Sequence, residues 1–305
     1  MPAFPEVDAT KQDSITDEQA QFFRDNGLLV IRNVLRGAEL KAMQEQTQPL
    51  VDRAVNEKPN DPDFFYKKHE LTGEQVPFRV EYVIEKTQAG KALLGHPFIL
   101  RSVEKLQGRN FIPTWDSMVF KQAGAGAAIP WHRDSGTGNG ADRCHIFNVD
   151  FYLDGSDMTN CLWGILGSNN WTPEEADAQV KKLNDAPGSF STDSACVPIL
   201  MNPGDVIFHN ILVLHGSPAA QSNLRRVVYY EFRPGEIERE FGPHQAEYIP
   251  LKQRVLLACL RHRAGSDYAR GEKAFAYQPS AEFAAPSLDE TLETYKFPHE
   301  KFWRK

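Results

Sequence analysis

The chain has 305 residues, with 34 Lys and Arg against 41 Asp and Glu, and its formal net charge is −7. At 41% hydrophobic and 25% charged residues, the composition is typical of a globular protein that buries a full core. The acidic balance argues against a nucleic-acid partner, and the apolar runs are too short to span a membrane. No apolar signal-peptide core opens the sequence, and the four scattered cysteines form no CxxC pair, so we expect a reduced, cytoplasmic protein.

The first third of the chain predicts helices and strands in alternation. Thr16 is a good N-cap for a helix that Gly27 closes, and the apolar, β-branched LLVIRNVL that follows is typical of a buried strand. Residues 37–55 carry apolar side chains at helical spacing. Alternation in residues 78–86 predicts another strand, and residues 89–106 return to a helical pattern.

The middle of the chain reads as β-structure. The apolar segments SMVFK, HIFNVDFYL, CLWGIL, PGDVIFHN and RRVVYYEF are separated by Gly, Pro, Asn and Asp, as in an antiparallel sandwich or barrel of the jelly-roll type. A capped helix is expected at residues 172–183, and RVLLACLRHR predicts a helix near the C-terminus. We expect one domain, with an N-terminal part at about 14–108, a β-core at about 110–234 and a C-terminal extension at about 245–305.

The segment IPWHRDSG contains the first pair of candidate metal ligands. In extended backbone, residues two apart point the same way, so His132 and Asp134 can converge while Arg133 faces away. An imidazole and a carboxylate from one strand end supply two ligands for a divalent metal. Alone, an H-x-D pair also fits a surface histidine beside a turn aspartate.

A third ligand is expected from PGDVIFHNILVLHGS. The strand after its Pro-Gly-Asp turn is expected to run to His215, and an antiparallel sheet can fold it back beside the first strand. Two histidines and a carboxylate form the facial triad, which leaves adjacent positions of iron(II) open. His209 competes for this role, but Gly216 allows the close approach of backbone that favours His215.

Arg225 and Arg226 open the strongly β-forming segment RRVVYYEF. Their side chains must face opposite sides of the strand. One of them could be buried, where a guanidinium needs a carboxylate and offers it a bidentate fork. Both could equally be solvated charges at a sheet edge.

Together these motifs resemble the phytanoyl-CoA dioxygenase family of iron(II)- and 2-oxoglutarate-dependent oxygenases. The likeness rests on WHRD, GDVIFHN, LHGS with an Arg pair beyond it, and CLWGILGS. ITDEQAQFFRDNGLLVIRNVL and RVLLACLRHR are similar to the bacterial or fungal small-molecule branch, so the resemblance covers nearly the whole chain. It implies a mainly β fold with flanking helices, a double-stranded β-helix (jelly-roll, cupin-like) core, and iron held by His132, Asp134 and His215.

The resemblance also implies a set of residues that bind 2-oxoglutarate. An Arg eleven residues after the second histidine grips its distal carboxylate in the family, which selects Arg226, and the hydroxyl of Ser217 joins it. A further basic contact falls on Arg79, which fits a surface charge on an amphipathic strand equally well. A family Met before the H-x-D strand maps to Met118, with the loop AGAGAAIP leaving that alignment ambiguous by one residue.

The strand HIFNVDFYL departs from the family pattern, because Asp150 stands where many relatives carry a Trp. By alternation Asn148, Asp150 and Tyr152 share one face, and we expect them to contact the substrate if that face lines the barrel. Asp150 would then orient a hydroxyl or amine. It could instead cap a ladder or bind Arg133 or Arg143.

The expected activity is hydroxylation of a small-molecule metabolite or natural-product intermediate, with O2 as second co-substrate and release of succinate and CO2. No catalytic residue beyond the metal centre is expected. Desaturation, epoxidation, cyclisation or epimerisation would use the same cofactors. A cupin-like metal-dependent hydrolase or isomerase would not need Arg226, and a non-catalytic ligand-binding module would form no succinate. The acidic composition favours a free small molecule over a CoA thioester.

Overall fold

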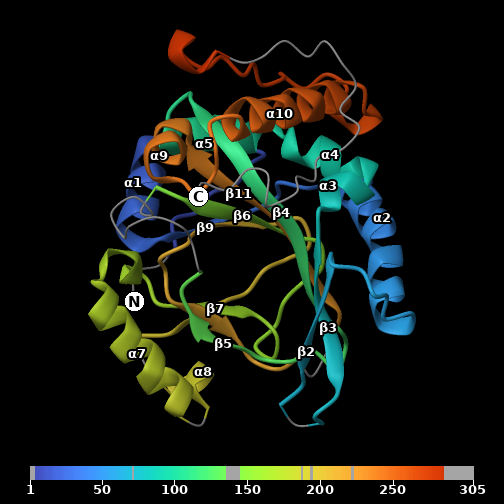
Figure 1. Ribbon diagram of the computed structural model, residues 1–305, viewed down its shortest axis with the longest axis vertical. Coiled ribbons are helices and arrows are strands. Elements are labelled where there is room, and N and C mark those ends of the chain that lie inside the picture. Colours follow the sequence, from blue (N-terminus) through green and yellow to red (C-terminus); the bar gives the residue numbers. More distant parts are fainter. Residues whose placement is uncertain are drawn as a thin grey trace.

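Two antiparallel sheets face each other in the computed structural model, which describes residues 4–70, 72–134, 145–186, 188–192, 195–220 and 223–284 (Figure 1). The seven-stranded sheet has the spatial order β1 (Leu28–Ile31), β9 (Val206–Asn210), β6 (Phe147–Tyr152), β11 (Arg225–Pro234), β4 (Phe111–Lys121), β3 (Gln75–Glu81), β2 (Phe64–Lys68). The four-stranded sheet has the order β5 (Ile129–His132), β10 (His215–Ser217), β7 (Leu162–Gly164), β8 (Val197–Ile199). This arrangement confirms the expected double-stranded β-helix core. The N-terminal strands β1, β2 and β3 extend its larger sheet.

Helices cover the outer faces of both sheets. The α-helices are α1 (Asp17–Asn26), α2 (Gly37–Asn56), α3 (Val83–Lys86), α4 (Gln88–Leu94), α5 (Pro97–Gln107), α7 (Pro173–Asp185), α8 (Ser189–Thr192), α9 (Gly235–Phe241) and α10 (Tyr248–Ala264). Short 3-10 helices are η1 (Ser168–Asn170), η2 (Asp267–Ala269) and η3 (Ala281–Phe283). Most of the helices pack on the seven-stranded sheet, while α7 and α8 lie beside the smaller one (Figure 1). Within the described residues, no helix is long and apolar enough to cross a membrane.

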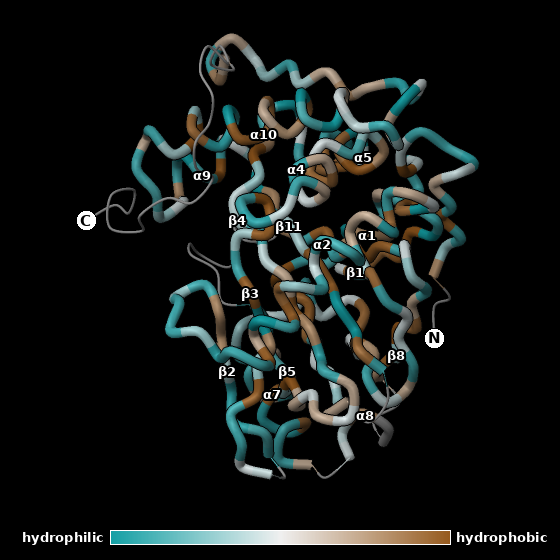
Figure 2. Tube along the Cα trace, turned by 90° about the vertical axis from the view of Figure 1, so that its right-hand side faces the viewer, coloured by the Kyte–Doolittle hydropathy of each residue, from teal (hydrophilic) through white to brown (hydrophobic). Residues whose placement is uncertain are grey.

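The hydrophobic core is split into layers by the side-chain alternation of the strands. Val228 and Tyr230 of β11 belong to the large cluster between the seven-stranded sheet and the helices. Val227, one residue away, belongs to a second cluster between the two sheets. Figure 2 shows hydrophobic segments gathered where the helices overlie the strands. Both faces of β11 are therefore buried, which leaves the strand without a solvent-facing side.

Local chemistry explains the predicted helices that the structure confirms. Helix α1 begins with a capping box between Thr16 and Gln19, and ends at Gly27, whose φ of 75° is the left-handed conformation that favours glycine. Helix α7 begins with the same device between Thr172 and Glu175. In both cases side chains satisfy backbone N–H groups that have no partner within the helix.

Two predicted elements are shorter than expected. The strand predicted over 78–86 ends at Glu81, because the Asp116 carboxylate accepts a hydrogen bond from the backbone N–H of Ile84 at 3.0 Å and holds the chain in the short helix α3. The helix predicted over 89–106 breaks between α4 and α5. There Gly95 packs so closely on α10 that a Cβ would lie 3.0 Å from the Cys259 carbonyl oxygen, and Pro97 starts the next helix.

The strand expected to run to His215 is interrupted. Strand β9 ends at Asn210, whose side-chain Oδ1 accepts a hydrogen bond from the backbone N–H of Leu212 at 2.9 Å and turns the chain. The chain then crosses from the larger sheet to the smaller one, where β10 begins at His215. As a result His209 and His215 come from different sheets, with their ring centroids 4.1 Å apart.

Candidate active site

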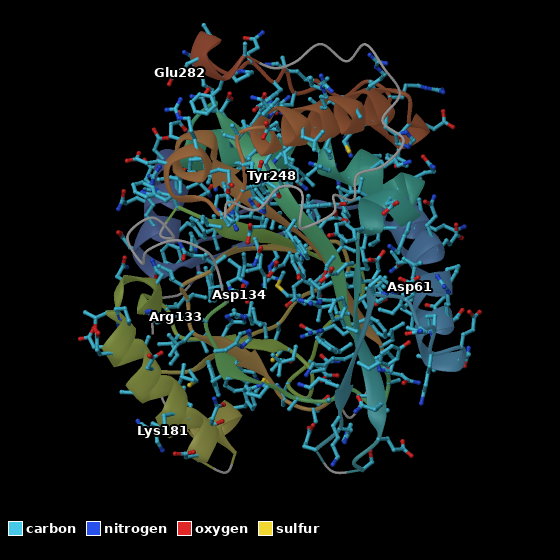
Figure 3. The ribbon with its side chains drawn as sticks, viewed as in Figure 1. Asp61, Arg133, Asp134, Lys181, Tyr248 and Glu282 are labelled. Carbon is cyan, nitrogen blue, oxygen red and sulfur yellow. The ribbon has the colours of Figure 1, made fainter. Side chains whose placement is uncertain are left out.

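A cluster of two histidines and one carboxylate lies between the sheets, at the end of β5. His132 and His215 are paired Cα partners on β5 and β10, and Asp134 follows two residues after His132. Their candidate ligand atoms all lie within 4.8 Å of one another, and Asp134 Oδ1 is 3.5 Å from His132 Nε2 and 3.7 Å from His215 Nε2. The predicted convergence of these three residues is therefore present. Arg133 points the other way, as expected, and donates to the Ser168 carbonyl oxygen at 2.7 Å (Figure 3).

Hydrogen bonds orient each member of this cluster. Nδ1 of His132 lies 2.8 Å from the Pro130 carbonyl oxygen, and Nδ1 of His215 lies 3.1 Å from the Val213 carbonyl oxygen. A carbonyl oxygen can only accept, so both Nδ1 atoms carry the proton and both Nε2 atoms present a bare lone pair to the centre. The Asn148 amide donates to Asp134 Oδ2 at 2.9 Å, which leaves Oδ1 directed at the histidines.

The surroundings of Asp134 and His215 favour the protonation states in which these two residues bind metal. Burial acts to raise the pKa of Asp134, but the neighbouring imidazoles of His215 and His132 lower it by more, and the net direction is downward. Burial moves the pKa of His215 well below its ordinary value, and His209 and His132 act in the same direction. A charged carboxylate beside neutral imidazoles is the donor set that divalent transition metals take.

Gly216 allows the two ligand strands to approach each other. A Cβ at this position would lie 3.0 Å from the Ile129 carbonyl oxygen and 3.2 Å from the Trp131 backbone nitrogen. Both distances are tighter than ordinary side-chain packing allows. The expectation that glycine follows His215 because backbone approaches closely there is confirmed.

The cluster of His132, Asp134 and His215, called the ligand cluster below, opens into a cavity of about 550 Å³ between the sheets. Alternate residues of β11 form one wall: Arg225, Val227, Tyr229, Glu231 and Arg233. Asn148, Asp150 and Tyr152 of β6 line the cavity beside them, so the face that these residues share by alternation points inward. The strand register thus fixes the order of groups along the cavity, from Arg225 at one end to Arg233 at the other.

Arg225 is a buried cation whose described partners are uncharged. It is 3% exposed, and its Nη1 donates to the Asn160 carbonyl oxygen at 2.7 Å and to Ser217 Oγ at 3.4 Å. Its Nε is buried and has no partner, and no ion pair joins Arg225 to a carboxylate of the described chain. A buried guanidinium is costly unless an anion pairs with it, so this end of the cavity is built for an anionic ligand.

A second buried basic side chain, Lys121, lies at this end of the cavity. It is 2% exposed and lies behind Ser217, where its Nζ donates to the Ser217 carbonyl oxygen at 3.3 Å and to that of Pro218. Burial, reinforced by the nearby Arg225, lowers the pKa of Lys121 to about 6. Sequence reasoning did not identify this lysine, which precedes a loop and has no motif around it.

The prediction that Arg226 faces the co-substrate is wrong. Its Nε and Nη2 both donate to the Asp154 carboxylate at 2.8 Å, and Nη1 donates to the Gln44 carbonyl oxygen at 2.8 Å, so the side chain points toward α2. The reason is the alternation of side chains along β11. Arg225 and Arg226 lie on opposite faces of the strand, and the odd-numbered residues line the cavity. The prediction that Met118 contacts the co-substrate is wrong for the same reason. Met118 is fully buried in the helix-facing core, and Val119 lines the cavity instead.

Arg79 and Asp150 also line the cavity, but both already have partners. Arg79 is ion-paired with Glu81 at 3.0 Å and lies over the Phe65 ring, while its buried Nε has no hydrogen-bond partner among the described residues. Asp150 Oδ2 lies 3.3 Å from His209 Nδ1, and this replaces the suggested pairing with Arg133. Arg143, the other suggested partner, lies outside the described residues.

The end of the cavity opposite Arg225 contains residues that sequence reasoning missed. Its walls include these side chains: Thr114, Trp115, Glu231, Arg233, His244 and Tyr248. Arg233 is paired with both Glu231 and Glu238, at 2.8 and 2.9 Å. Glu231 Oε1 accepts from Arg233 and Thr114, whereas Oε2 has no partner among the described residues. Extending the alternation of β11 from Arg225 would have found Glu231 and Arg233, but His244 and Tyr248 lie outside any strand.

Comparisons with known proteins identify the family and the fold of the chain. A family model described as phytanoyl-CoA dioxygenase (PhyH) matches residues 23–228. The crystal structures of EvdMO1 and of AviO1 from Streptomyces viridochromogenes Tue57 each share 24% identity with the chain, with TM-scores of 0.58 and 0.51. These matches cover 71% and 70% of this chain, 92% of AviO1, and only 49% of EvdMO1, so the chain spans about half of the latter's length.

A third similar structure is the non-heme alpha ketoglutarate dependent carbocyclase SnoK from nogalamycin biosynthesis. It is 18% identical, with a TM-score of 0.57, and the match covers 74% of this chain and 89% of that one. At such identities the likeness demonstrates the fold. No curated protein sequence matches the chain.

Proposed function

Because the chain belongs to the phytanoyl-CoA dioxygenase family of iron(II)- and 2-oxoglutarate-dependent oxygenases, we propose that it hydroxylates a small organic molecule and releases succinate and CO2. The observation that supports this proposal is the pairing of two features in one cavity. A two-histidine, one-carboxylate cluster lies in its middle, and at one end lies the buried Arg225, which pairs with no carboxylate of the described residues. The first fits a metal and the second fits a dicarboxylate.

In this proposal His132, Asp134 and His215 hold iron(II). Their donor set fits the metal because both Nε2 lone pairs and Asp134 Oδ1 face one point, while Asn148 holds the second carboxylate oxygen away from it. Three protein ligands on one side leave the other coordination positions for co-substrates. When bound, iron and 2-oxoglutarate supply the oxidative chemistry with O2, and the protein supplies position and exclusion of water.

Arg225 and Ser217 hold the distal carboxylate of 2-oxoglutarate. Ser217 Oγ lies 3.4 Å from Arg225 Nη1, so one carboxylate can contact both. Asp150 of β6 and Tyr229 of β11 are paired Cα partners. This pair lies beside the cluster of His132, Asp134 and His215. Arg225 is four residues from Tyr229, or roughly 13 Å along the strand. An arginine side chain and a five-carbon dicarboxylate together fill that span.

The substrate lies at the opposite end of the cavity, beside Glu231. With the co-substrate at the Arg225 end, the volume left over is walled by Trp115, Glu231 and Tyr248. Arg233, the arginine at this end, is already neutralised, since it is paired with Glu231 and Glu238. The open Oε2 of Glu231 is an acceptor, which favours a substrate with a hydroxyl or ammonium group over an anion such as a CoA thioester.

The test is anaerobic addition of iron(II) and 2-oxoglutarate to the metal-free protein, with the visible absorption of the chelate as readout. Its absence in protein shown to contain iron would overturn the cofactor assignment. A screen for substrate-dependent succinate release then identifies the substrate. Product mass separates hydroxylation, which adds an oxygen atom, from desaturation, cyclisation or epimerisation at the same metal centre.

A further inference from the structure

A line of three buried side chains leads away from the ligand cluster on the side of β6. His209 Nε2 lies 3.1 Å from His215 Nδ1, and His209 Nδ1 lies 3.3 Å from Asp150 Oδ2. The three residues are between 4% and 8% exposed. They come from β6, β9 and β10, so this line connects the larger sheet to the smaller one.

One backbone carbonyl fixes the direction of the hydrogen bonds along this line. Because Nδ1 of His215 also lies 3.1 Å from the Val213 carbonyl oxygen, that nitrogen carries the proton. His209 Nε2 must then accept from it, which places the proton of His209 on Nδ1, where Asp150 accepts it. The order is therefore metal, His215, His209, Asp150, with every donor facing an acceptor.

We propose that His209, backed by Asp150, is a positioning residue for the metal ligand His215. This inference rests on the iron site proposed above. The Val213 carbonyl oxygen sets the tautomer of His215, the hydrogen bond to His209 holds its ring orientation, and the Asp150 carboxylate at the end of the line strengthens its lone pair. A carboxylate behind a metal-bound histidine is a recurring arrangement, and here a second imidazole is inserted between the two.

The geometry separates this role from the two alternatives for His209. A third metal ligand would need a free nitrogen directed at the cluster, but both nitrogens of His209 face His215 and Asp150. The converging ligand atoms come from His132, Asp134 and His215. A histidine that merely fills the core would not contact a metal ligand, whereas His209 touches one directly.

Metal affinity tests the proposal without any substrate. Apoprotein is titrated anaerobically with cobalt(II) alone, using a chelating dye to measure affinity and the visible ligand-field bands to report the coordination of His215. His209→Leu should weaken cobalt binding about 10–100-fold and shift the bands. His209→Gln can accept from His215 and donate to Asp150, so it should recover most of the affinity. Asp150→Asn keeps an acceptor but removes the charge, and should fall between them.

A buried histidine remote from the cavity provides the matched control. His96, at the start of α5, is 8% exposed, and His96→Leu should leave cobalt affinity unchanged. Wild-type cobalt affinity and bands in His209→Leu would overturn the inference and leave the proposed function standing. A loss of cobalt affinity in His96→Leu equal to that in His209→Leu would do the same. If the wild-type protein binds no cobalt or iron, the proposed metal site fails together with the inference. If His209→Leu does not fold, the cobalt affinities of His209→Gln and Asp150→Asn decide. The proposal is overturned if neither variant loses affinity.

Discussion

Arg225→Gln should weaken 2-oxoglutarate binding without weakening the fold. A buried guanidinium that loses its carboxylate partner, or a carboxylate that loses its guanidinium, costs about 2–5 kcal/mol. Arg225 donates to neutral oxygens of Asn160 and Ser217, so part of its hydrogen bonding goes to the protein. We therefore expect about 2–4 kcal/mol, or roughly 30- to 1000-fold in Kd. Titration of anaerobic iron(II) protein with 2-oxoglutarate, followed by its visible band, measures the change.

Arg226→Gln is the matched control, because the same side chain one residue away has the opposite surroundings. It removes a bidentate ion pair with Asp154 in which the Arg226 side chain is buried. The free energy of unfolding should fall by about 3–5 kcal/mol. The 2-oxoglutarate affinity of the folded protein should stay near wild type. If Arg226→Gln weakens 2-oxoglutarate and Arg225→Gln does not, the assignment by side-chain alternation along β11 is refuted.

Three further changes probe the same cavity. Burial lowers the pKa of Lys121 to about 6 from 10.5, so between these values the unfolded chain binds one more proton and the free energy of unfolding rises with pH. Denaturation at about pH 7, 8 and 9 should show this slope, about 1.4 kcal/mol per unit, in wild type but not in Lys121→Met, and parallel profiles would contradict it. Loss of a residue that hydrogen-bonds a metal ligand costs roughly 10–100-fold in metal affinity, and Asp134→Ala should lower iron(II) affinity by more than this. Unchanged iron content after dialysis would argue against Asp134 as a ligand. Glu231→Gln should reduce substrate-dependent succinate release about tenfold while 2-oxoglutarate affinity stays constant, and a change in that affinity would place the substrate elsewhere.

Residue spacing predicted the parts of the site that depend on local geometry. His132 and Asp134 converge because residues two apart on an extended strand share a side, and that rule needs no knowledge of the fold. The same alternation placed Asn148, Asp150 and Tyr152 on one face of β6. The capped helices α1 and α7 are also local, since Thr16 and Thr172 satisfy backbone groups within their own first turns.

Long-range packing decided the features that spacing could not give. Alternation showed that Arg225 and Arg226 face opposite sides, but both sides of β11 are buried, and the two arginines themselves do not show which side faces the cavity. Met118 and Val119 present the same ambiguity on β4. The short helix α3 likewise depends on Asp116, a residue far along the chain, which overrides the strand pattern of residues 82–86.

The two neighbouring arginines show how surroundings distinguish a structural charge from a ligand-binding one. Both are about equally buried, at 3% and 5% exposure, so burial alone does not separate them. The chain gives Arg226 a carboxylate at 2.8 Å, whereas the described chain gives Arg225 only neutral oxygens and leaves its Nε without a partner. Burying an unpaired cation costs several kcal/mol, which lowers the stability of the ligand-free fold. An anion that enters the cavity would offset that cost, and we therefore expect the arginine that the described chain leaves unpaired, Arg225, to be the one that selects the dicarboxylate.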